Sequence, residues 1–308
     1  MNATAISSVV TDGKAAGCRA IDLRVEGGID LRLLPDRGLD AGDAWFAGVR
    51  ISWTSSVGET APVGTNWMRS FGGGLMTTCG LLNVGLPSEG HPQHGEYTFQ
   101  RAVVTAVEPL RDGYLEVRGR IAEVQALAHW LEVERTWRTH GGEGLIELED
   151  VLTNRGRETT PALQLYHVNL GPPLWSAGAE LVMDASVTRP RDADAEPYAD
   201  SWGVAPGVVE GAPERVFEHD VSPGPDGWCS ATVHNGALGL EVEIRWDKST
   251  LPRLWQWVHP APGIGVLGIE PANCSVLGVG HDRAEGRMPE LAPGESVRTR
   301  LQIRARRV

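Results

Sequence analysis

The stretch "IDLRVEGGIDLRLLPDRG", Ile21 to Gly38, contains two runs of alternating apolar residues separated by a Gly-Gly pair. The first run places Ile21, Leu23 and Val25 on one side, and the second run resumes the alternation directly after Gly28. A period of two is typical of strands that bury one face, and a Gly-Gly pair between such runs is typical of a tight hairpin. The sequence therefore predicts that the chain begins with antiparallel β structure.

The same alternation recurs along the chain and predicts the fold class. It is clearest in residues 114–121 ("YLEVRGRI"), 130–138 ("WLEVERTWR"), 238–246 ("LGLEVEIRW") and 296–305 ("SVRTRLQIRA"). We expect roughly fifteen to twenty strands, and no long helix, because no stretch of about twelve residues combines helical spacing of apolar groups with capping signals. The prediction is an all-β protein, a large antiparallel β-sandwich, with functional residues in long loops.

Two regions interrupt this pattern: residues 64–95, which are rich in glycine, and residues 188–227, which are rich in Pro, Asp and Ala. Since the strands on both sides of the second region look alike, we interpret it as an excursion from one sandwich. The prediction is a single domain that spans residues 1–308. Oligomeric state is left open, although an edge of the sandwich could pair in a homodimer.

Composition narrows the class of partner. The 308 residues include 40 acidic and 28 basic side chains, and the net charge of -12 disfavours nucleic acid and anionic membrane surfaces. We see no signal peptide and no segment of the ~18 apolar residues that a membrane span needs, so a cytoplasmic location is expected. The four cysteines form no C-x-x-C pair and are expected to be reduced thiols. Eleven Trp residues fit either core packing or stacking on sugar rings.

The loop "HPQHGEY" holds His91, His94 and Glu96, which together could suggest a metal site. The zinc motif H-E-x-x-H requires a helix, however, and Pro92 and Gly95 prevent a regular helix here. We therefore expect no metal. His94, beside a flexible glycine, is better placed than His91 to present an imidazole to a ligand, and His91 is interpreted as loop surface.

Two further stretches place polar groups in unusual surroundings. In "LQLYHVNLGPPL" the alternation puts His167 on one face with two leucines, and Asn169 follows near the end of the strand. In "MRSFGGGL" Arg69 precedes three glycines, which permit unusual dihedral angles or a close approach of the backbone. Taken alone, a histidine on a face with leucines is more often a core residue than a catalyst, and Arg69 could equally be a surface arginine beside a glycine-rich crossover.

Glu270 is the strongest physical indication of a site. It interrupts an apolar run, and a carboxylate in such a strand either pairs with a cation or has a raised pKa, both of which are common in active sites. On the preceding strand Gln256 faces one way and Trp257 the other, but periodicity does not decide which side is core.

Taken in order, these stretches resemble the aldose 1-epimerase, or galactose mutarotase-like, superfamily, in a poorly characterised bacterial branch. The resemblance rests on "LPDRGLDAGDAW", "FGGGLMTTCGLLNVG", "HG", "LYHVNLG", "GIEPAN" and "LAPGES", and runs from about Leu31 to Ile303. It implies a sandwich that binds a pyranose and interconverts its α and β anomers by acid–base ring opening, without cofactor or metal.

The resemblance also implies roles for individual residues. Glu270 corresponds to the general base and His167 to the general acid. His94, Arg69 and Gln256 correspond to sugar-binding residues. The family's binding aspartate has no clear counterpart, and Asp220 is a weak candidate.

Three further residues complete the predicted substrate site: Asn169, Trp257 and Arg37, the last of which either recognises an anionic group or pairs with its neighbour Asp36. The sugar itself is not identified by the sequence, and it could be neutral or anionic. Two alternatives stay open: another sugar isomerase, lyase or hydrolase on the same fold, and a carbohydrate-binding module without catalysis.

Overall fold

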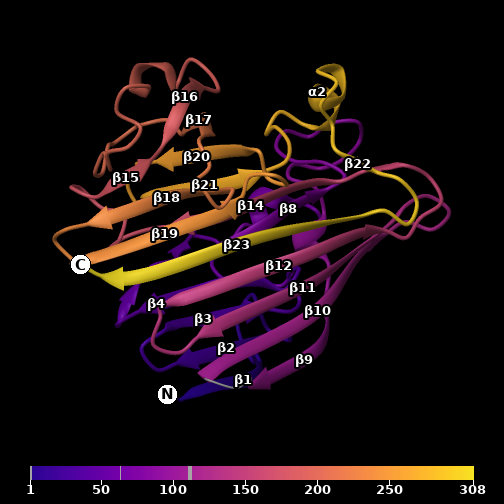
Figure 1. Cartoon of the computed structure of the whole chain (residues 1–308), viewed down its shortest axis with the longest axis horizontal. Coiled ribbons are helices and arrows are strands. Elements are labelled where there is room, and N and C mark those ends of the chain that lie inside the picture. Colours follow the sequence, from indigo (N-terminus) through magenta and orange to yellow (C-terminus); the bar gives the residue numbers. More distant parts are fainter. Residues whose placement is uncertain (1, 63, 110–112) are drawn as a thin grey trace.

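The computed structural model describes residues 2–62, 64–109 and 113–308, and within these ranges two large antiparallel sheets dominate (Figure 1). The first sheet has eleven strands: Ala3–Val9 (β1), Arg19–Val25 (β2), Ile29–Leu34 (β3), Asp40–Phe46 (β4), Val49–Arg50 (β5), Met76–Leu81 (β8), Leu163–Leu170 (β14), Ala185–Pro190 (β16), Arg215–Val221 (β17), Arg253–His259 (β20) and Val266–Ala272 (β21). The second sheet has eight strands: Val103–Pro109 (β9), Tyr114–Val124 (β10), Trp130–His140 (β11), Leu145–Asn154 (β12), Glu180–Met183 (β15), Trp228–Asn235 (β18), Leu240–Asp247 (β19) and Ser296–Arg307 (β23). The predicted all-β sandwich is thereby confirmed.

The remaining elements are short. Two small ladders pair Trp53–Thr54 (β6) with Gly73–Gly74 (β7), and Thr160–Pro161 (β13) with Glu290–Leu291 (β22). The helices of the described residues are Trp67–Ser70 (α1), Val279–Ala284 (α2) and the 3-10 turns Tyr97–Phe99 (η1) and Glu196–Tyr198 (η3). None of the helices in these ranges is long and apolar enough to cross a membrane.

The hairpin predicted from the opening stretch is present as β2 and β3. Ile21 lies opposite Leu33 and Leu23 opposite Leu31, so the two apolar runs face the same side. Side chains alternate between buried and half-buried along β3, as expected for a strand with one face in the core.

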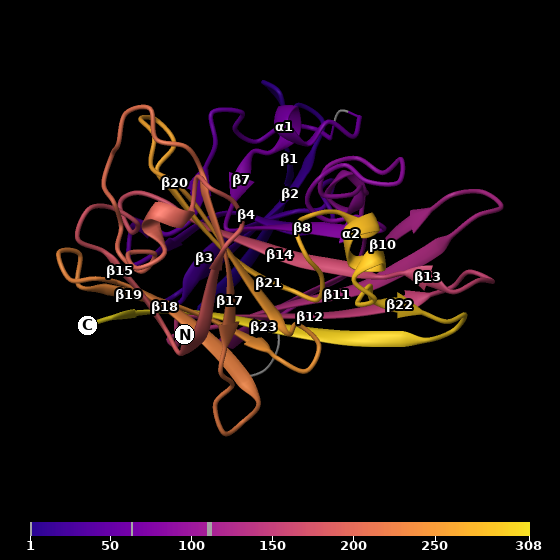
Figure 2. The same cartoon turned by 90° about the horizontal axis from the view of Figure 1, so that it is seen from above.

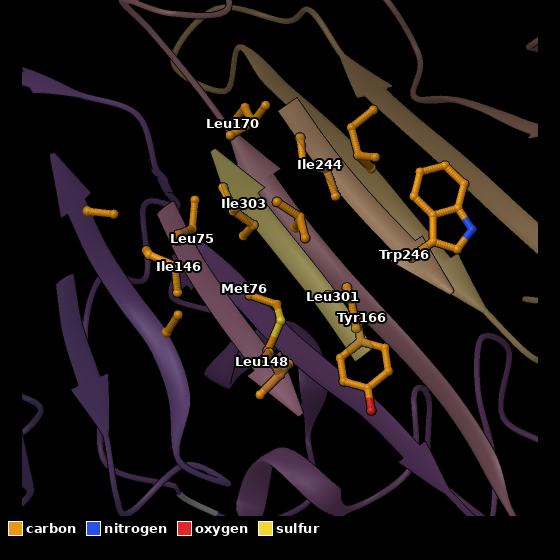
Figure 3. Packing of buried hydrophobic residues seen from close by; sticks show 14 of the residues in the cluster. Leu75, Met76, Ile146, Leu148, Tyr166, Leu170, Ile244, Trp246, Leu301 and Ile303 are labelled. Carbon is orange, nitrogen blue, oxygen red and sulfur yellow. The ribbon is translucent and has the colours of Figure 1, made fainter. Parts of the chain in front are cut away.

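The two sheets pack face to face, and the main apolar core lies between them (Figure 2). Figure 3 shows the middle of this core, where side chains from both sheets interdigitate; ten of them are Leu75, Met76, Ile146, Leu148, Tyr166, Leu170, Ile244, Trp246, Leu301 and Ile303. Each of these ten side chains is buried. The alternating runs of the sequence therefore supply the inner faces of both sheets.

Strands β8, β14 and β21 lie side by side in the middle of the first sheet and are buried along their whole length. On β14, Tyr166 and Val168 point into the core between the sheets, whereas Leu163 and Leu165 belong to a second apolar cluster. Because successive side chains of a strand point to opposite faces, the second cluster covers the outer face of the first sheet. This outer face carries the candidate site.

The glycine-rich stretch after Arg69 folds as predicted, with close backbone approach. Gly74 has φ 98°, and a Cβ atom there would lie 2.6 Å from the carbonyl oxygen of Ala41. The resulting β6–β7 ladder sets Trp53 opposite Gly74. A tryptophan is thus brought to the edge of the outer face.

Strands from distant parts of the chain are neighbours in both sheets. In the first sheet β4, β8, β14 and β21 are consecutive neighbours, and in the second sheet β23 lies between β19 and β12 (Figure 1). Nothing in this arrangement tests where domains begin and end, so the single domain over residues 1–308 stays a prediction.

Candidate functional site

The centre of the site is a histidine and a glutamate on neighbouring strands. The register that places Val168 of β14 opposite Ile269 of β21 also places His167 opposite Glu270. Both side chains therefore project from the outer face, and His167 Nε2 lies 3.1 Å from Glu270 Oε1. Their residues are only 5% and 3% exposed. The two groups are thus in close contact, but the contact is not a hydrogen bond within the described residues, where Glu270 Oε1 is a buried atom without a hydrogen-bond partner.

Burial sets the charge state of the pair. Removal from water, with a smaller contribution from the negative charge of Glu214, raises the pKa of Glu270 to about 8. Burial also lowers the pKa of His167 to about 3, with a smaller contribution from His94. Both shifts favour uncharged groups at neutral pH. The pair then holds one mobile proton, which resides on Glu270 in the resting protein.

Gly268 provides the space in which the two groups meet. It is two residues before Glu270 on β21, and a Cβ atom at this position would lie 2.5 Å from Glu270 Oε1 and 3.2 Å from His167 Cε1. Any larger residue would push the carboxyl group or the imidazole aside. Glycine is thus required at position 268 so that the Glu270 and His167 side chains can approach each other. The motif "GIEPAN" alone does not reveal this steric requirement.

We expect Gly268→Ala to lower the rate of any reaction that His167 and Glu270 carry out by about 10²-fold, because displacement of a reacting group by about 1 Å has an effect of this size. Overpacking should also lower the free energy of unfolding by about 1–3 kcal/mol. Gly236→Ala is a suitable control, since a Cβ atom there would meet only His234 Nε2, at 3.6 Å. Steady-state kinetics and urea unfolding of both variants would measure the two effects. A Gly268→Ala variant that is unimpaired in both measurements would show that the close approach is not needed.

Aromatic rings surround the pair. The rings of Phe71 and Trp257 lie 5.3 and 5.4 Å from the imidazole of His167. Trp53 packs edge-on against Trp257 at 5.8 Å, and its Nε1–H donates to the carbonyl oxygen of Ile264 at 2.7 Å. Trp257 is half-buried, and Trp53 and Phe71 are buried. The tryptophans near the site therefore pack the outer face, and the partly accessible Trp257 is the one that can also stack on a sugar ring.

His94 joins this group from the loop between β8 and η1. Its ring lies 4.5 Å from that of Trp67 and 6.2 Å from that of His167. The backbone N–H of Gly85 donates to His94 Nδ1 at 3.4 Å, which leaves Nε2 as the protonated nitrogen. Burial lowers the pKa of His94 to about 4, so the ring is neutral and offers one N–H donor.

The loop is fastened to the end of β8. The Gly80 N–H donates to the carbonyl oxygen of His94, and the Glu96 N–H donates to that of Gly80. Gly95, with φ 71°, allows this contact, because a Cβ atom there would lie 2.2 Å from Gly80 O. The position of His94 is consequently set by backbone hydrogen bonds.

Asn169 lies on the same face as His167, opposite Gly268. It is fully buried, and its Nδ2 donates to the carbonyl oxygen of His167 at 2.9 Å. Within the described residues, Asn169 Oδ1 and His167 Nδ1 are buried atoms that have no hydrogen-bond partner. Buried polar atoms are normally satisfied, so these two atoms indicate a place for a polar ligand or water.

A charged group from the 188–227 excursion borders the site. Glu214 Oε2 accepts from Trp257 Nε1 at 3.0 Å, and Glu214 Oε1 accepts from Arg191 at 3.0 Å. Glu214 thereby fixes the orientation of Trp257 and places a carboxylate beside Glu270. No local pattern indicates this role of Glu214, because its segment has no periodicity and only the fold brings it to the site.

Within the described residues, three residues predicted to contact substrate form no hydrogen bond or ion pair with His167 or Glu270. Gln256 lies on the opposite face of β20 from Trp257, where its Oε1 is 2.8 Å from His219 Nε2 and its Nε2 donates to the Trp202 carbonyl oxygen. Arg37 is buried and donates to two backbone carbonyl oxygens, those of Thr60 and Ser70. Arg69 is on α1 with its side chain exposed, and no hydrogen bond or ion pair of that side chain occurs in the described ranges. These functions therefore stay predictions without geometric support.

The carboxylates near these residues also have other partners. Asp36 does not pair with Arg37, as one interpretation held; its carboxylate accepts from Arg19 at 2.9 Å. Asp220 is exposed and pairs with Lys248 at 2.6 Å. His91 belongs to a tight turn in which it exchanges backbone hydrogen bonds with Ser88. Across residues 2–62, 64–109 and 113–308, no group of three or more His, Cys, Asp or Glu side chains is arranged to hold a metal ion.

The two packed antiparallel sheets of this chain form a galactose mutarotase-like fold. Solved structures support this class. A Klebsiella pneumoniae protein described provisionally as an aldose 1-epimerase is 25% identical, with a TM-score of 0.92 over 98% of this chain and 83% of that chain. A galactose mutarotase-like protein from Clostridium acetobutylicum is 13% identical, with a TM-score of 0.70 over 99% of both chains. The predicted family resemblance is confirmed at the level of fold.

The sequence itself assigns the chain to a more particular family. The family described as "Domain of unknown function (DUF4432)" matches residues 15–305, and the protein belongs to it. Among curated proteins no sequence matches this chain.

Proposed function

We propose that this protein is an aldose 1-epimerase that interconverts the α and β anomers of a pyranose. The observation that carries the proposal is the 3.1 Å approach of His167 Nε2 to Glu270 Oε1. Opening a hemiacetal requires removal of a proton from the anomeric hydroxyl and delivery of a proton to the ring oxygen. Both oxygens are bonded to the same carbon, so the base and the acid must also be neighbours.

The reaction follows from the one mobile proton of the pair. Transfer of that proton from Glu270 to His167 Nε2 creates a carboxylate and an imidazolium. Glu270 then accepts the proton of the anomeric hydroxyl while His167 protonates the ring oxygen, and the bond between the anomeric carbon and the ring oxygen breaks. The aldehyde rotates about the C1–C2 bond, and the reverse transfers close the ring on its other face. Protons and electrons balance without any other reactant.

The surrounding groups suit sugar binding. His94 Nε2–H is a donor, and the unpaired Asn169 Oδ1 is an acceptor. Glu214, held by Trp257 and Arg191, retains free lone pairs for sugar hydroxyls and supplies the carboxylate that the family's binding aspartate would provide. Trp257 offers an indole surface for the ring.

The test is saturation-transfer NMR of anomeric exchange with a panel of neutral, carboxylated and sulfonated monosaccharides. We expect exchange of at least one sugar to be accelerated far above the buffer rate. Binding of a sugar without acceleration of its exchange would favour a carbohydrate-binding module. Turnover to a product other than the anomer would favour another sugar enzyme on this fold.

The pH profile is a separate prediction. The carboxylate–imidazolium form that reacts contains the same number of protons as the uncharged resting pair. The pair loses one of these protons as the pH rises through the pKa of Glu270, about 8. We therefore expect kcat/KM to be level around neutrality and to fall as the pH rises above about 8. Polarimetry across pH 5 to 10 would measure this. A rate that increases through pH 8 would show that Glu270 acts alone as a carboxylate.

A further inference from the structure

A second hollow lies on the protein surface, apart from the pair. It has a volume of about 530 Å³ and is lined by Arg189 of β16, Glu218 and Asp220 of β17, Arg253 of β20 and Arg287, which follows α2. Volumes of roughly 300–1,000 Å³ are usual for small-molecule sites. Segments that are far apart in the sequence thus converge on one space large enough for a metabolite.

The register of the sheet fixes the relation between this hollow and the pair. Arg189 lies opposite Glu218, Glu218 opposite Trp255, and Trp255 opposite Glu270. Side chains that are directly opposite share a face, so the hollow is on the same outer face and two strands, or about 10 Å, from Glu270. Trp255 stands between them. It is 4% exposed, and its Nε1–H donates to the Cys274 carbonyl oxygen at 3.1 Å. The hollow is therefore separate from the pair.

The charges of the hollow are unusual for this protein. The chain carries a net charge of -12, yet three arginines line this one space. Both lining acids already have basic partners: Glu218 Oε1 is 2.5 Å from Arg253 Nη1, and Asp220 Oδ1 is 2.6 Å from Lys248 Nζ. The acids consequently do not neutralise the other two arginines.

Those two arginines have capacity for a ligand. In the described part of the chain, the Arg189 side chain has no hydrogen bond or ion pair. Arg287 has only two long contacts, from Nε to Asp282 Oδ1 at 4.0 Å and from Nη2 to His281 Nε2 at 3.4 Å. His219, which also lines the hollow, is held by Thr188 and Gln256, and burial lowers its pKa to about 4, so it adds no charge. Arg189 and Arg287 are left to present free guanidinium groups, beside Arg253, which is paired with Glu218.

We propose that this hollow is a second binding site and that it takes the phosphate group of a small phosphomonoester. Planar guanidinium forks donate pairs of N–H groups to phosphate oxygens, and several forks from different directions match a tetrahedral dianion. The volume exceeds that of a phosphate alone, which leaves space for a short carbon chain beside Pro252. The proposal does not depend on the epimerase reaction.

Calorimetric titration with glycerol 3-phosphate tests the site, with inorganic phosphate and uncharged glycerol as comparisons. We expect glycerol 3-phosphate to bind, phosphate to bind more weakly, glycerol not to bind, and the affinity to fall as salt is added. Arg189→Gln and Arg287→Gln should each weaken binding by about three- to tenfold, and the double variant by more than about tenfold. Both residues are exposed, so folding should be unaffected.

Two control variants distinguish binding in this hollow from binding elsewhere on the protein. Arg120→Gln removes an exposed arginine of β10 on the other sheet and should leave the affinity unchanged. Glu270→Gln should also bind glycerol 3-phosphate normally, whether or not the epimerase proposal is correct. The proposal is overturned if no phosphate compound binds at millimolar concentration, if the double variant binds like wild type, if Arg120→Gln weakens binding equally, or if binding is lost in Glu270→Gln.

Discussion

Replacing Glu270 by glutamine is expected to reduce anomeric exchange by about 10²–10⁴-fold, the range that a well-placed general base contributes. The carboxamide has nearly the same shape, so the strand should stay in place. It cannot accept the proton of the anomeric hydroxyl, and it cannot hold the mobile proton that the resting pair keeps on Glu270. The measurement is NMR exchange with whichever sugar of the panel the wild type turns over.

The chain offers a closely matched control. Glu123, on β10 of the other sheet, is 3% exposed like Glu270, and burial raises its pKa to about 8 as well. Its Oε2 accepts from the Leu81 N–H at 3.1 Å, and a glutamine can keep this bond through its carbonyl oxygen. Glu123→Gln should therefore retain activity. If removal of any buried carboxyl group lowers the activity, both variants should be impaired. If Glu270 acts as the base, only Glu270→Gln should be impaired.

The result also distinguishes the competing functions. If Glu270→Gln binds the sugar as wild type does and the rate falls as expected, the catalytic role is supported. If the wild type binds sugar without accelerating exchange, there is no activity to lose and the protein is a binding module. A near-wild-type rate in Glu270→Gln would remove Glu270 from the mechanism.

The sequence predicted those parts of the structure that depend on short-range patterns. Alternation identified the strands, and along β14 it correctly separated Leu163, Leu165 and His167 from Tyr166 and Val168. An apolar strand interrupted by Glu270 correctly indicated a buried carboxyl group with a raised pKa. Local sequence carries this information because the side-chain direction of a strand repeats every two residues.

The sequence was less informative about which groups meet across the fold. Alternation showed that Gln256 and Trp257 face opposite ways, but the resemblance placed both at the sugar, and only Trp257 lies beside His167. Arg37 was expected at the ligand or beside Asp36, yet its fork is used by the carbonyl oxygens of Thr60 and Ser70. A guanidinium can be satisfied by any nearby oxygen, so sequence alone does not name its partner.

The second large effect is expected at Arg135, which is fully buried between the sheets. Its guanidinium bonds Asp150 through two N–H groups at 2.9 and 2.7 Å and Asp40 through a third at 2.7 Å. We expect Arg135→Ala to lower the free energy of unfolding by about 3–5 kcal/mol, because two buried carboxylates lose their counter-charge. Urea unfolding followed by tryptophan fluorescence would measure this. Arg298→Ala, which removes an exposed arginine 3.8 Å from Glu149, should change stability by less than about 1 kcal/mol.

The double variant Arg135→Met with Asp150→Asn shows whether the effect arises from uncompensated charge. If it does, Asp150→Asn should be much less harmful in the Arg135→Met background than in the wild type. Equal effects in both backgrounds would mean that lost packing dominates, and a stable Arg135→Ala protein would mean that the carboxylates become protonated at little cost.

This buried network also bears on the site, because one of its acids is bonded to the strand that carries His167 and the other to the neighbouring strand. Asp150 accepts from the hydroxyl group of Tyr166, the residue before His167 on β14, and Asp40 accepts from Thr78 on the adjacent strand β8. Tyr166 faces the core between the sheets, where it bonds to Asp150, and His167 faces the outer side, where it contacts Glu270. The same strand is therefore held in place from both of its faces. Arg135→Ala should consequently impair catalysis even at temperatures where the chain remains folded. The readout is a fall in kcat that exceeds the fraction unfolded, with sugar affinity less affected.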